Sequence, residues 1–470
     1  MLLIPEGFAP LAAPSSAPRG SDEWWMHHLS KKLAQRLPQI HRNEQWLQGT
    51  PPLPYPDKGG NFRQLQRLAS LNLAQLITNA RLHRIQLQTF QTAVDDSTDG
   101  DDEVNRLLRT ADGKHQLRTA LRWMAGLSVG YLLVDHIDPA EGSVGGVRIT
   151  AEHPSQMIVE PNPSDAARPL AALKVYRDEV NDRDVAVLWR PGYTRTAVHE
   201  GPTILPKGPA KNWRLHPGMW ALEDEPTEMP VGYVPVVELP GQEGQSCFEQ
   251  HIPTMERINH SILQRMILIA LQAFRQRGLK GAPRTDPSTG DEIDYDAIFE
   301  SDPGSLWILP QAVEIWESGQ ADITPVLNAV RDDLKHLAAV SNTPLYMLAP
   351  DAANESASGS DLKREGIVFE VEDIILGISG RLVAAISTAL QLAGFPDRAD
   401  PASIRASWAD PRRSSLTERA EAGRAAKEAG VPWRTRMEKF MQLSPEEIAA
   451  AELQRSQDAL LEQIAVASDG

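Results

Sequence analysis

The stretch 321-ADITPVLNAVRDDLKHLAAVSNTP-344, with the apolar run that follows from about residue 360, decides how this chain folds. In the first part apolar residues recur at helical spacing as far as Thr343 and Pro344, where the proline removes a backbone donor and excludes the helical conformation from its predecessor. They are Val326, Leu327, Val330, Leu334, Leu337 and Val340. The second part repeats apolar residues in steps of three and four, which keeps them on one face for roughly nine turns, or about 45 Å. They are Ile367, Val371, Ile374, Ile378, Leu382, Ile386 and Leu390. The sequence therefore predicts two amphipathic helices.

Between these helices lies a segment of small and polar residues, 348-LAPDAANESASGSD-361, which cannot bury itself. A short polar loop before a long apolar helix is typical of ordinary core packing. Its interpretation therefore depends on the neighbouring segments.

The composition is that of a soluble globular chain, with 470 residues, 41% hydrophobic and 23% charged. This length predicts two to four subdomains. No run of eighteen apolar residues occurs, which argues against a membrane span. The single cysteine, Cys247, excludes an internal disulfide and a cysteine-cluster metal site. The first 21 residues lack the basic start and apolar core of a signal peptide and are expected to form a flexible Pro/Ala/Ser-rich arm.

The formal net charge of −16 argues against tight non-specific DNA binding, because such binding needs Lys and Arg to displace counterions from phosphates. It does not exclude DNA as something that the protein surrounds without gripping. Simple solubility explains the acidic balance as well.

The first 248 residues combine helices with short strands. Helices are expected over residues 22–50, with a break near Pro38 and a cap at Gly49, from Asn61 through Asn79, and over 117–127. The acidic stretch 97–103 is expected to be a solvated loop. Candidate strands lie at 129–134, 147–150, 157–160, 172–176, 185–189, 194–199 and 234–239. We expect an α+β or α/β lobe that is not a run of βαβ units.

Helical patterns return after Phe248, with a broad apolar stripe that ends at Gly278. A Gly/Pro/Asp-rich insertion of about forty residues follows, with a strand expected at 306–309, before the helix that begins near residue 321. The C-terminal part is expected to be helical. Ser415 with Glu418 and Ser444 with Glu447 have the spacing of capping boxes, and Gly430 and Pro432 mark an end and a new start.

The motif search finds no chemistry. No phosphate-binding loop, dinucleotide fingerprint, zinc-protease helix, serine-hydrolase elbow or EF-hand loop occurs. Ser360 and Lys363 match an SxxK pattern but lack its companion motifs. His27 and His28 are adjacent and point to different sides of a helix, and the acidic pairs at 101–102 and 332–333 are expected to face solvent. We therefore expect a protein that is not an enzyme and has no cofactor or metal.

Six segments, in order, resemble the portal protein of tailed double-stranded-DNA bacteriophages, in its siphophage-type branch. RNEQWLQGTPPLP at 42–54 resembles that family's Tyr-Tyr-x-Gly…Pro-Leu-Pro segment, although Trp46 and Leu47 replace the aromatic pair. LSVGYLLVD at 127–135 resembles its Gly-x-Gly-Tyr-Val-x-Val strand, with Ser128 where glycine or tyrosine is common. EHPSQMIVEPNP at 152–163 resembles its His-Pro…Glu-x-Asp-Pro segment.

The other three segments lie in the helical half. The stretch 252–281 resembles the family's stem helix, with its Arg-Ile-Asn and Ala-Phe-x-Gln-Arg elements. SNTPLYML at 341–348 resembles its Thr-Pro-x-Tyr-Leu segment, and residues 407–433 resemble its Trp-x-Asp-Pro…Ala-Gly-x-Pro helix. The likeness covers roughly residues 40 to 460 as diffuse landmarks.

The resemblance implies a mostly helical α+β subunit of a ring of about twelve copies, with DNA passing through its centre. Its parts would be an arm (1–21), an α/β wing (22–248), a first stem helix (249–274), a clip (275–320), a second stem helix (321–341), a tunnel-loop region (342–360), a long helix with its connection (361–411) and a helical crown (412–470). Implied DNA-facing residues are Asp351, Asn354, Glu355, Ser356 and Ser358, followed by Lys363 and Arg364 as a weak cationic ring. Implied partner-binding residues of the clip are Arg275, Arg277, Lys280 and Arg284.

The implied function is a channel at one capsid vertex of a virion, present in the host cytoplasm during assembly, for DNA packaging and ejection. Implied partners are the large subunit of terminase, a head-completion or adaptor protein, and capsid and scaffolding proteins, with no membrane. Two readings from other classes stay open. One is a helical adaptor or scaffold protein of the virion that forms no ring, and the other is a hydrolase whose site assembles only in three dimensions.

Overall fold

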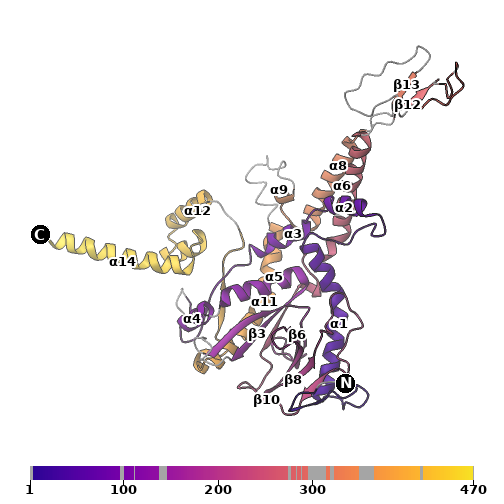
Figure 1. Cartoon of the computed structure of the whole chain (residues 1–470). Helices are drawn as coiled ribbons and strands as arrows, with labels where there is room; N and C mark the ends of the chain where they lie inside the picture. The colour runs from indigo at the N-terminus through magenta and orange to yellow at the C-terminus, as the bar shows by residue number, and fades with distance from the viewer. Residues whose placement is uncertain are drawn as a thin grey trace. The chain divides into compact units, whose positions relative to one another are not determined.

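The structure is a computed structural model that describes residues 4–95, 100–110, 112–136, 146–273, 277–281, 283–286, 288–294, 314–317, 322–348, 365–412 and 416–468. It confirms an α+β fold, with helices and antiparallel sheets (Figure 1). The chain divides into two compact units. One contains Met1–Pro52, Leu71–Met255 and Lys335–Gly470, and the other contains Leu53–Ser70 and Glu256–Leu334. The domain boundaries implied by the resemblance stay predictions.

The expected helix break at Pro38 is wrong. Helix α1 (Asp22–Leu47) runs through the proline without interruption. Proline removes one backbone hydrogen bond of a helix. Packing compensates for it, since Leu33, Leu37 and Ile40 are all buried on either side of the proline. The helix ends as expected just before Gly49, whose φ of 72° lies in the left-handed region.

The helix expected from Asn61 through Asn79 is two helices, α2 (Gly60–Leu68) and α3 (Leu73–Leu82). The expectation of one helix is wrong because Asn72 caps the second one. Its side-chain oxygen accepts a hydrogen bond from the Gln75 backbone N–H at 3.2 Å, and its amide donates to the Leu47 carbonyl at 2.9 Å. A side chain that bonds the backbone in this way favours a helix start over a helix interior.

All seven predicted strands between 129 and 240 are confirmed, and every strand pair among the described residues is antiparallel. The larger sheet has the order β1 (Phe8–Pro10), β9 (Ala221–Glu223), β8 (Tyr193–Glu200), β7 (Arg183–Arg190), β6 (Ala171–Asp178) and β5 (Met157–Glu160), with β10 (Thr227–Glu228) paired to β8. The segment expected to be a flexible arm supplies β1. Leu11, which follows it, is buried, so residues 8–11 belong to the fold.

A smaller sheet has the order β11 (Val236–Pro240), β3 (Val129–His136) and β4 (Val147–Glu152). Alternate residues of β3 belong to two cores, as the two-residue period of a strand requires. Tyr131 and Leu133 pack with the larger sheet, whereas Leu132 and Val134 pack in the core that contains α5 (Gly113–Leu127) and α11 (Glu365–Leu392). On the other face of the larger sheet lies α1. The first unit is therefore a stack of α1, two sheets, and a layer containing α5 and α11.

Helix α11 is the centre of this unit. All seven residues predicted to form its apolar face are buried. Of the helices in the described ranges, α11 alone has the length and apolar composition of a membrane span, and 61% of its most apolar window is buried inside the protein. Its contacts are those of a core helix.

The expectation that the acidic residues of 97–103 are solvated is wrong for Asp101. It is fully buried, and its Oδ1 accepts hydrogen bonds from the backbone N–H groups of Glu103 at 2.9 Å and Val104 at 3.1 Å. These bonds cap α4 (Asp102–Thr110). Its Oδ2 accepts from Arg398 at 2.6 Å, so the carboxylate also connects α4 to the segment after α11. Near Arg398, β14 (Arg405–Trp408) pairs with β2 (Leu87–Gln91).

The second unit contains most of α6 (Ile252–Ala273), the first part of α8 (Thr324–Val340), α2, and a hairpin of β12 (Arg277–Lys280) and β13 (Glu314–Glu317). The helices predicted near 249–274 and 321–341 are thus present. Arg257 of α6 pairs with Asp333 of α8 at 2.9 Å, so of the acidic pair 332–333 only Asp332 is exposed. The strand expected at 306–309 lies outside the described residues.

The C-terminal part is helical as expected, with α12 (Leu416–Glu428), α13 (Trp433–Thr435), a π-helical turn (Arg436–Phe440) and α14 (Pro445–Ser468). The second capping box is confirmed. The Ser444 backbone N–H donates to the Glu447 carboxylate at 2.8 Å, and the Glu447 N–H donates to the Ser444 hydroxyl at 3.3 Å. Of the first box, Ser415 lies outside the described residues.

We predict that Gly130→Ala unfolds the first unit, whereas Gly380→Ala stabilises it. A Cβ at Gly130 would lie 2.1 Å from the Ala120 carbonyl oxygen, so β3 and α5 would have to separate. Overpacking of this kind costs about 3 kcal/mol or more. A Cβ at Gly380 on α11 meets nothing within 4 Å, so alanine there should add about 0.5–1 kcal/mol. Thermal melting followed by circular dichroism compares the two, and equal melting temperatures would contradict the role of the β3–α5 contact.

Candidate functional site

The candidate site is the base of the segment between α8 and α11. Residues 349–364 of this segment lie outside the described residues, and with them all seven residues predicted to face DNA, namely Asp351, Asn354, Glu355, Ser356, Ser358, Lys363 and Arg364. The structure describes the residues at which the segment begins and ends. The candidate site is therefore described at those two ends.

At the first end, α8 is terminated by buried hydroxyl groups. Ser341 and Thr343 are almost completely buried, and their hydroxyls lie 2.9 Å apart. The Ser341 hydroxyl also donates to the Leu337 carbonyl at 2.6 Å, and the Thr343 backbone N–H donates to the Ala338 carbonyl at 3.1 Å. Asn342 has a φ of 48°, which an asparagine tolerates better than most residues. The Ser-Asn-Thr-Pro sequence thus ends the helix and fixes the direction in which the chain leaves it.

At the other end, the first turn of α11 packs directly against this exit. A Cβ built on Gly366 would lie 2.8 Å from the Asn342 side-chain oxygen, so a larger residue at this position would have to displace the Asn342 side chain. The end of α8 and the start of α11, which the segment 343–365 connects, therefore lie in contact.

A buried arginine of α3 holds both ends together. Arg81 is 1% exposed, and its Nε and Nη2 donate to the two carboxylate oxygens of Glu370 on α11 at 2.6 and 2.8 Å. Its Nη2 also donates to the Ser341 carbonyl at 2.6 Å. A bidentate pair fixes orientation as well as distance. One guanidinium thus connects α3, the exit of α8 and the first part of α11.

A cavity of about 380 Å³ lies beside this pair, and Arg81, Glu370, Ser246, Cys247 and His251 are among the residues that line it. Burial raises the pKa of the Cys247 thiol, which keeps it protonated and therefore a weak nucleophile. Burial, assisted by the Arg81 charge, lowers the pKa of His251, so its imidazole is neutral at pH 7. Within the part of the chain that the structure describes, no group of three His, Cys, Asp or Glu residues could hold a metal ion. The arrangement is suited to fixing backbone positions.

The predicted partner-binding bases lie around the hairpin of the second unit. Arg275 falls outside the described residues, and Arg284 is exposed. In the β12–β13 ladder, Arg277 lies opposite Glu317 and Lys280 lies opposite Glu314. Each of these two bases thus faces an acidic residue in the strand register, which the sequence pattern did not indicate. Their role in partner binding stays a prediction.

Sequence reasoning missed Arg81 and Glu370. Neither belongs to a motif, and they are 289 residues apart in the chain. The sequence offered one weak sign that Arg81 is buried, which is that it comes shortly after the apolar residues of the helix predicted to end at Asn79. The sign is weak because an arginine in such a place ordinarily extends into solvent.

No family model matches this chain, and no curated protein matches it. Solved structures similar to it include the following three. A chain from "Neck of native GTA particle computed with C12 symmetry" is 11% identical, with a TM-score of 0.42, and the match covers 77% of this chain and 84% of that one. A chain from "Virion of native gene transfer agent (GTA) particle" is 11% identical, with a TM-score of 0.42 and coverage of 79% and 89%. A chain from "Neck of empty GTA particle computed with C6 symmetry" is 10% identical, with a TM-score of 0.46 and coverage of 82% and 94%. Likenesses at this level identify no family.

We predict that Arg81→Met and Glu370→Gln each destabilise the first unit, and that the double variant loses less than the sum of the two. Removal of one partner leaves a buried charge or carbonyl unpaired, which costs about 3–5 kcal/mol for a buried pair. This double-mutant cycle is measured by comparing the melting temperatures of the unchanged protein, the two single variants and the double variant. The matched control is Arg122→Met, an exposed arginine on α5, for which no shift is expected. Strict additivity would show that the two side chains do not act together.

Proposed function

We propose that this chain is a portal protein, a subunit of a ring-shaped channel through which double-stranded DNA enters and leaves a capsid. The observation that carries the proposal is the closed base of the segment 343–365, formed by Ser341, Asn342 and Gly366 and held by Arg81. It lies at the Ser-Asn-Thr-Pro segment, one of the six that resemble the portal family in order. The proposal rests on these residues, and the solved structures named above add no argument to it.

The closed base supports the proposal for a mechanical reason. A polar segment that touches passing DNA transmits force to its two attachment points. When both points are held by one bidentate ion pair and by a glycine contact, the force acts on a packed core and not on a free helix end. The segment can then contact the duplex while α8 and α11 keep their positions.

The charge balance supports a conduit in the same way. With a net charge of −16 on each copy, a ring presents few bases to the duplex. Six to ten phosphate contacts already make binding strong and salt-dependent, so a basic bore repeated around a ring would hold DNA in place. In the proposed channel Asp351 and Glu355 repel the phosphates, and Lys363 and Arg364 supply a limited attraction.

In this proposal the protein is not an enzyme. The energy for packaging comes from a partner ATPase, the large subunit of terminase, which fits the missing phosphate-binding loop. A head-completion protein binds the region around the hairpin of the second unit through Arg275, Arg277, Lys280 and Arg284. The protein resides at one vertex of the virion and assembles in the host cytoplasm with capsid and scaffolding proteins.

We expect the purified protein to form rings. Negative-stain electron microscopy should show a particle with a central hole wide enough for a duplex, and light scattering should give a mass of about twelve copies. A particle that stays monomeric over a range of salt and protein concentrations would favour a virion adaptor that forms no ring.

Replacement of Asp351 and Glu355 by lysine should impair DNA packaging and leave ring assembly intact. Two new bases on each copy place about two dozen around a ring of about twelve, enough to retain DNA through phosphate contacts. Packaged DNA per particle is measured by nuclease protection, and rings are counted by microscopy. Asp332→Lys, at an exposed acid of α8, is the matched control. Normal packaging by the double variant would remove these two residues from the channel.

A further inference from the structure

The large sheet carries a basic loop that the proposed function does not use. Residues 201–220, between β8 and β9, contain Lys207, Lys211 and Arg214 and no acid, in a chain whose formal net charge is −16. All three bases are exposed. None of them takes part in an ion pair among the described residues. The loop itself therefore carries three exposed bases and no acid, on an acidic protein.

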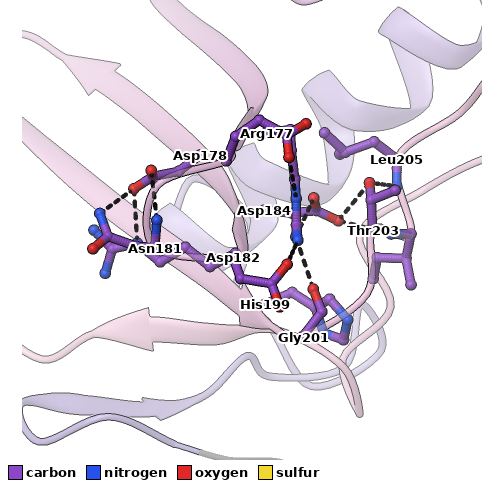
Figure 2. A network of polar contacts seen from close by, with 12 residues as sticks. Arg177, Asp178, Asn181, Asp182, Asp184, His199, Gly201, Thr203 and Leu205 are labelled. Carbon is purple, nitrogen blue, oxygen red and sulfur yellow. Dashed lines mark hydrogen bonds and ion pairs between the residues drawn. The ribbon is translucent and has the colours of Figure 1, made fainter.

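The start of this loop is fixed by a buried carboxylate. Asp184 of β7 is fully buried, and its Oδ2 accepts hydrogen bonds from the Ile204 backbone N–H at 2.7 Å and from the Thr203 hydroxyl at 3.2 Å. Its Oδ1 accepts from Arg177 at 3.2 Å, and the same Arg177 nitrogen donates to the Gly201 carbonyl at 2.7 Å. Figure 2 shows these contacts converging on Asp184 from β6 and from the loop. The network attaches residues 201–204 rigidly to the sheet.

The rest of the loop is held in the same manner. The Trp213 indole N–H donates to the Ile204 carbonyl at 3.1 Å, and Leu215 and Trp220 are fully buried. The His199 ring nitrogen Nδ1 donates to the Met219 carbonyl at 2.7 Å, which fixes the end of the loop. Prolines at 206, 209 and 217 restrict the backbone further. A loop ordered before binding loses little conformational entropy when a partner docks.

We propose that Lys207, Lys211 and Arg214 form a docking surface for an acidic segment of another protein. Charge complementarity is the argument: three exposed bases without an ion-pair partner lie on a loop that is fixed to the sheet, and the same loop carries an exposed Met219, a combination that suits carboxylates accompanied by an apolar side chain. The inference is independent of the channel proposal, because it concerns the large sheet alone.

The chemistry of the loop favours an acidic protein over a nucleic acid. A duplex carries one charge per about 1.7 Å, so it would present many more phosphates than three bases can neutralise. Single strands bind by stacking bases on exposed aromatic faces. The two tryptophans of the loop offer no such face, since Trp220 is buried and Trp213 is half-buried with its N–H already bonded. A protein segment with a few carboxylates matches the number of bases.

The test compares binding of two probes by fluorescence anisotropy. One probe is a fluorescein-labelled peptide of glutamate, alanine and leucine, and the other is a labelled duplex DNA. The full-length protein should bind the peptide more tightly than the duplex, and peptide binding should weaken between about 50 and 200 mM NaCl, because exposed charges are screened.

The decisive variant is Lys207→Gln/Lys211→Gln/Arg214→Gln, which should bind the peptide about tenfold more weakly, through the loss of three exposed charge contacts. The matched control is Lys31→Gln/Lys427→Gln/Arg122→Gln, which removes two exposed lysines and one exposed arginine elsewhere and should bind within about twofold of the unchanged protein. Both variants should keep the melting temperature, since all six side chains are exposed. Equal losses in both variants, no peptide binding, or tighter binding of the duplex would each overturn the proposal.

Discussion

The bidentate contact of Arg81 with Glu370 is the constraint on which the arrangement of the helices around α11 depends. A guanidinium buried to this extent needs oxygen atoms that accept from its donors. Its remaining contacts are carbonyls of its own helix and of Ser341. The position of α3 is thus coupled to the end of one long helix and the beginning of another. A shift of any of these elements would leave a buried charge without its partner.

The packing of successive layers extends this constraint to the rest of the first unit. The apolar face of α11 packs in one core with β3 and β4, and the opposite residues of β3 pack with the larger sheet, which is covered by α1 on its other side. Each layer buries one face of the next, so the cavity beside Arg81 and the basic loop on the larger sheet belong to one packed unit. The buried polar residues Asp101, Asp184 and Arg81 lie near the ends of helices and strands of these layers. There backbone groups that lack a secondary-structure partner need one from a side chain.

Local patterns predicted most of this fold. The steps of three and four residues along α11 gave its buried face, and alternation gave the strands, because both are consequences of backbone period alone. Pro38, Asp101 and Arg81 were misjudged or missed because their states depend on contacts made far along the chain. A proline in a helix is tolerated when packing compensates, and a charge is buried when a distant partner meets it. For the candidate site, the sequence indicated the segment between α8 and α11 and could not indicate the contact of Asn342 with Gly366 at its base.

That contact has an evolutionary consequence. The residues that hold the two ends of the segment together, Arg81, Glu370, Asn342 and Gly366, all lie outside residues 349–364. Substitutions at these four positions would change how the ends are held without changing the residues proposed to face DNA. Selection can therefore act on the attachment of the segment and on its composition at separate positions.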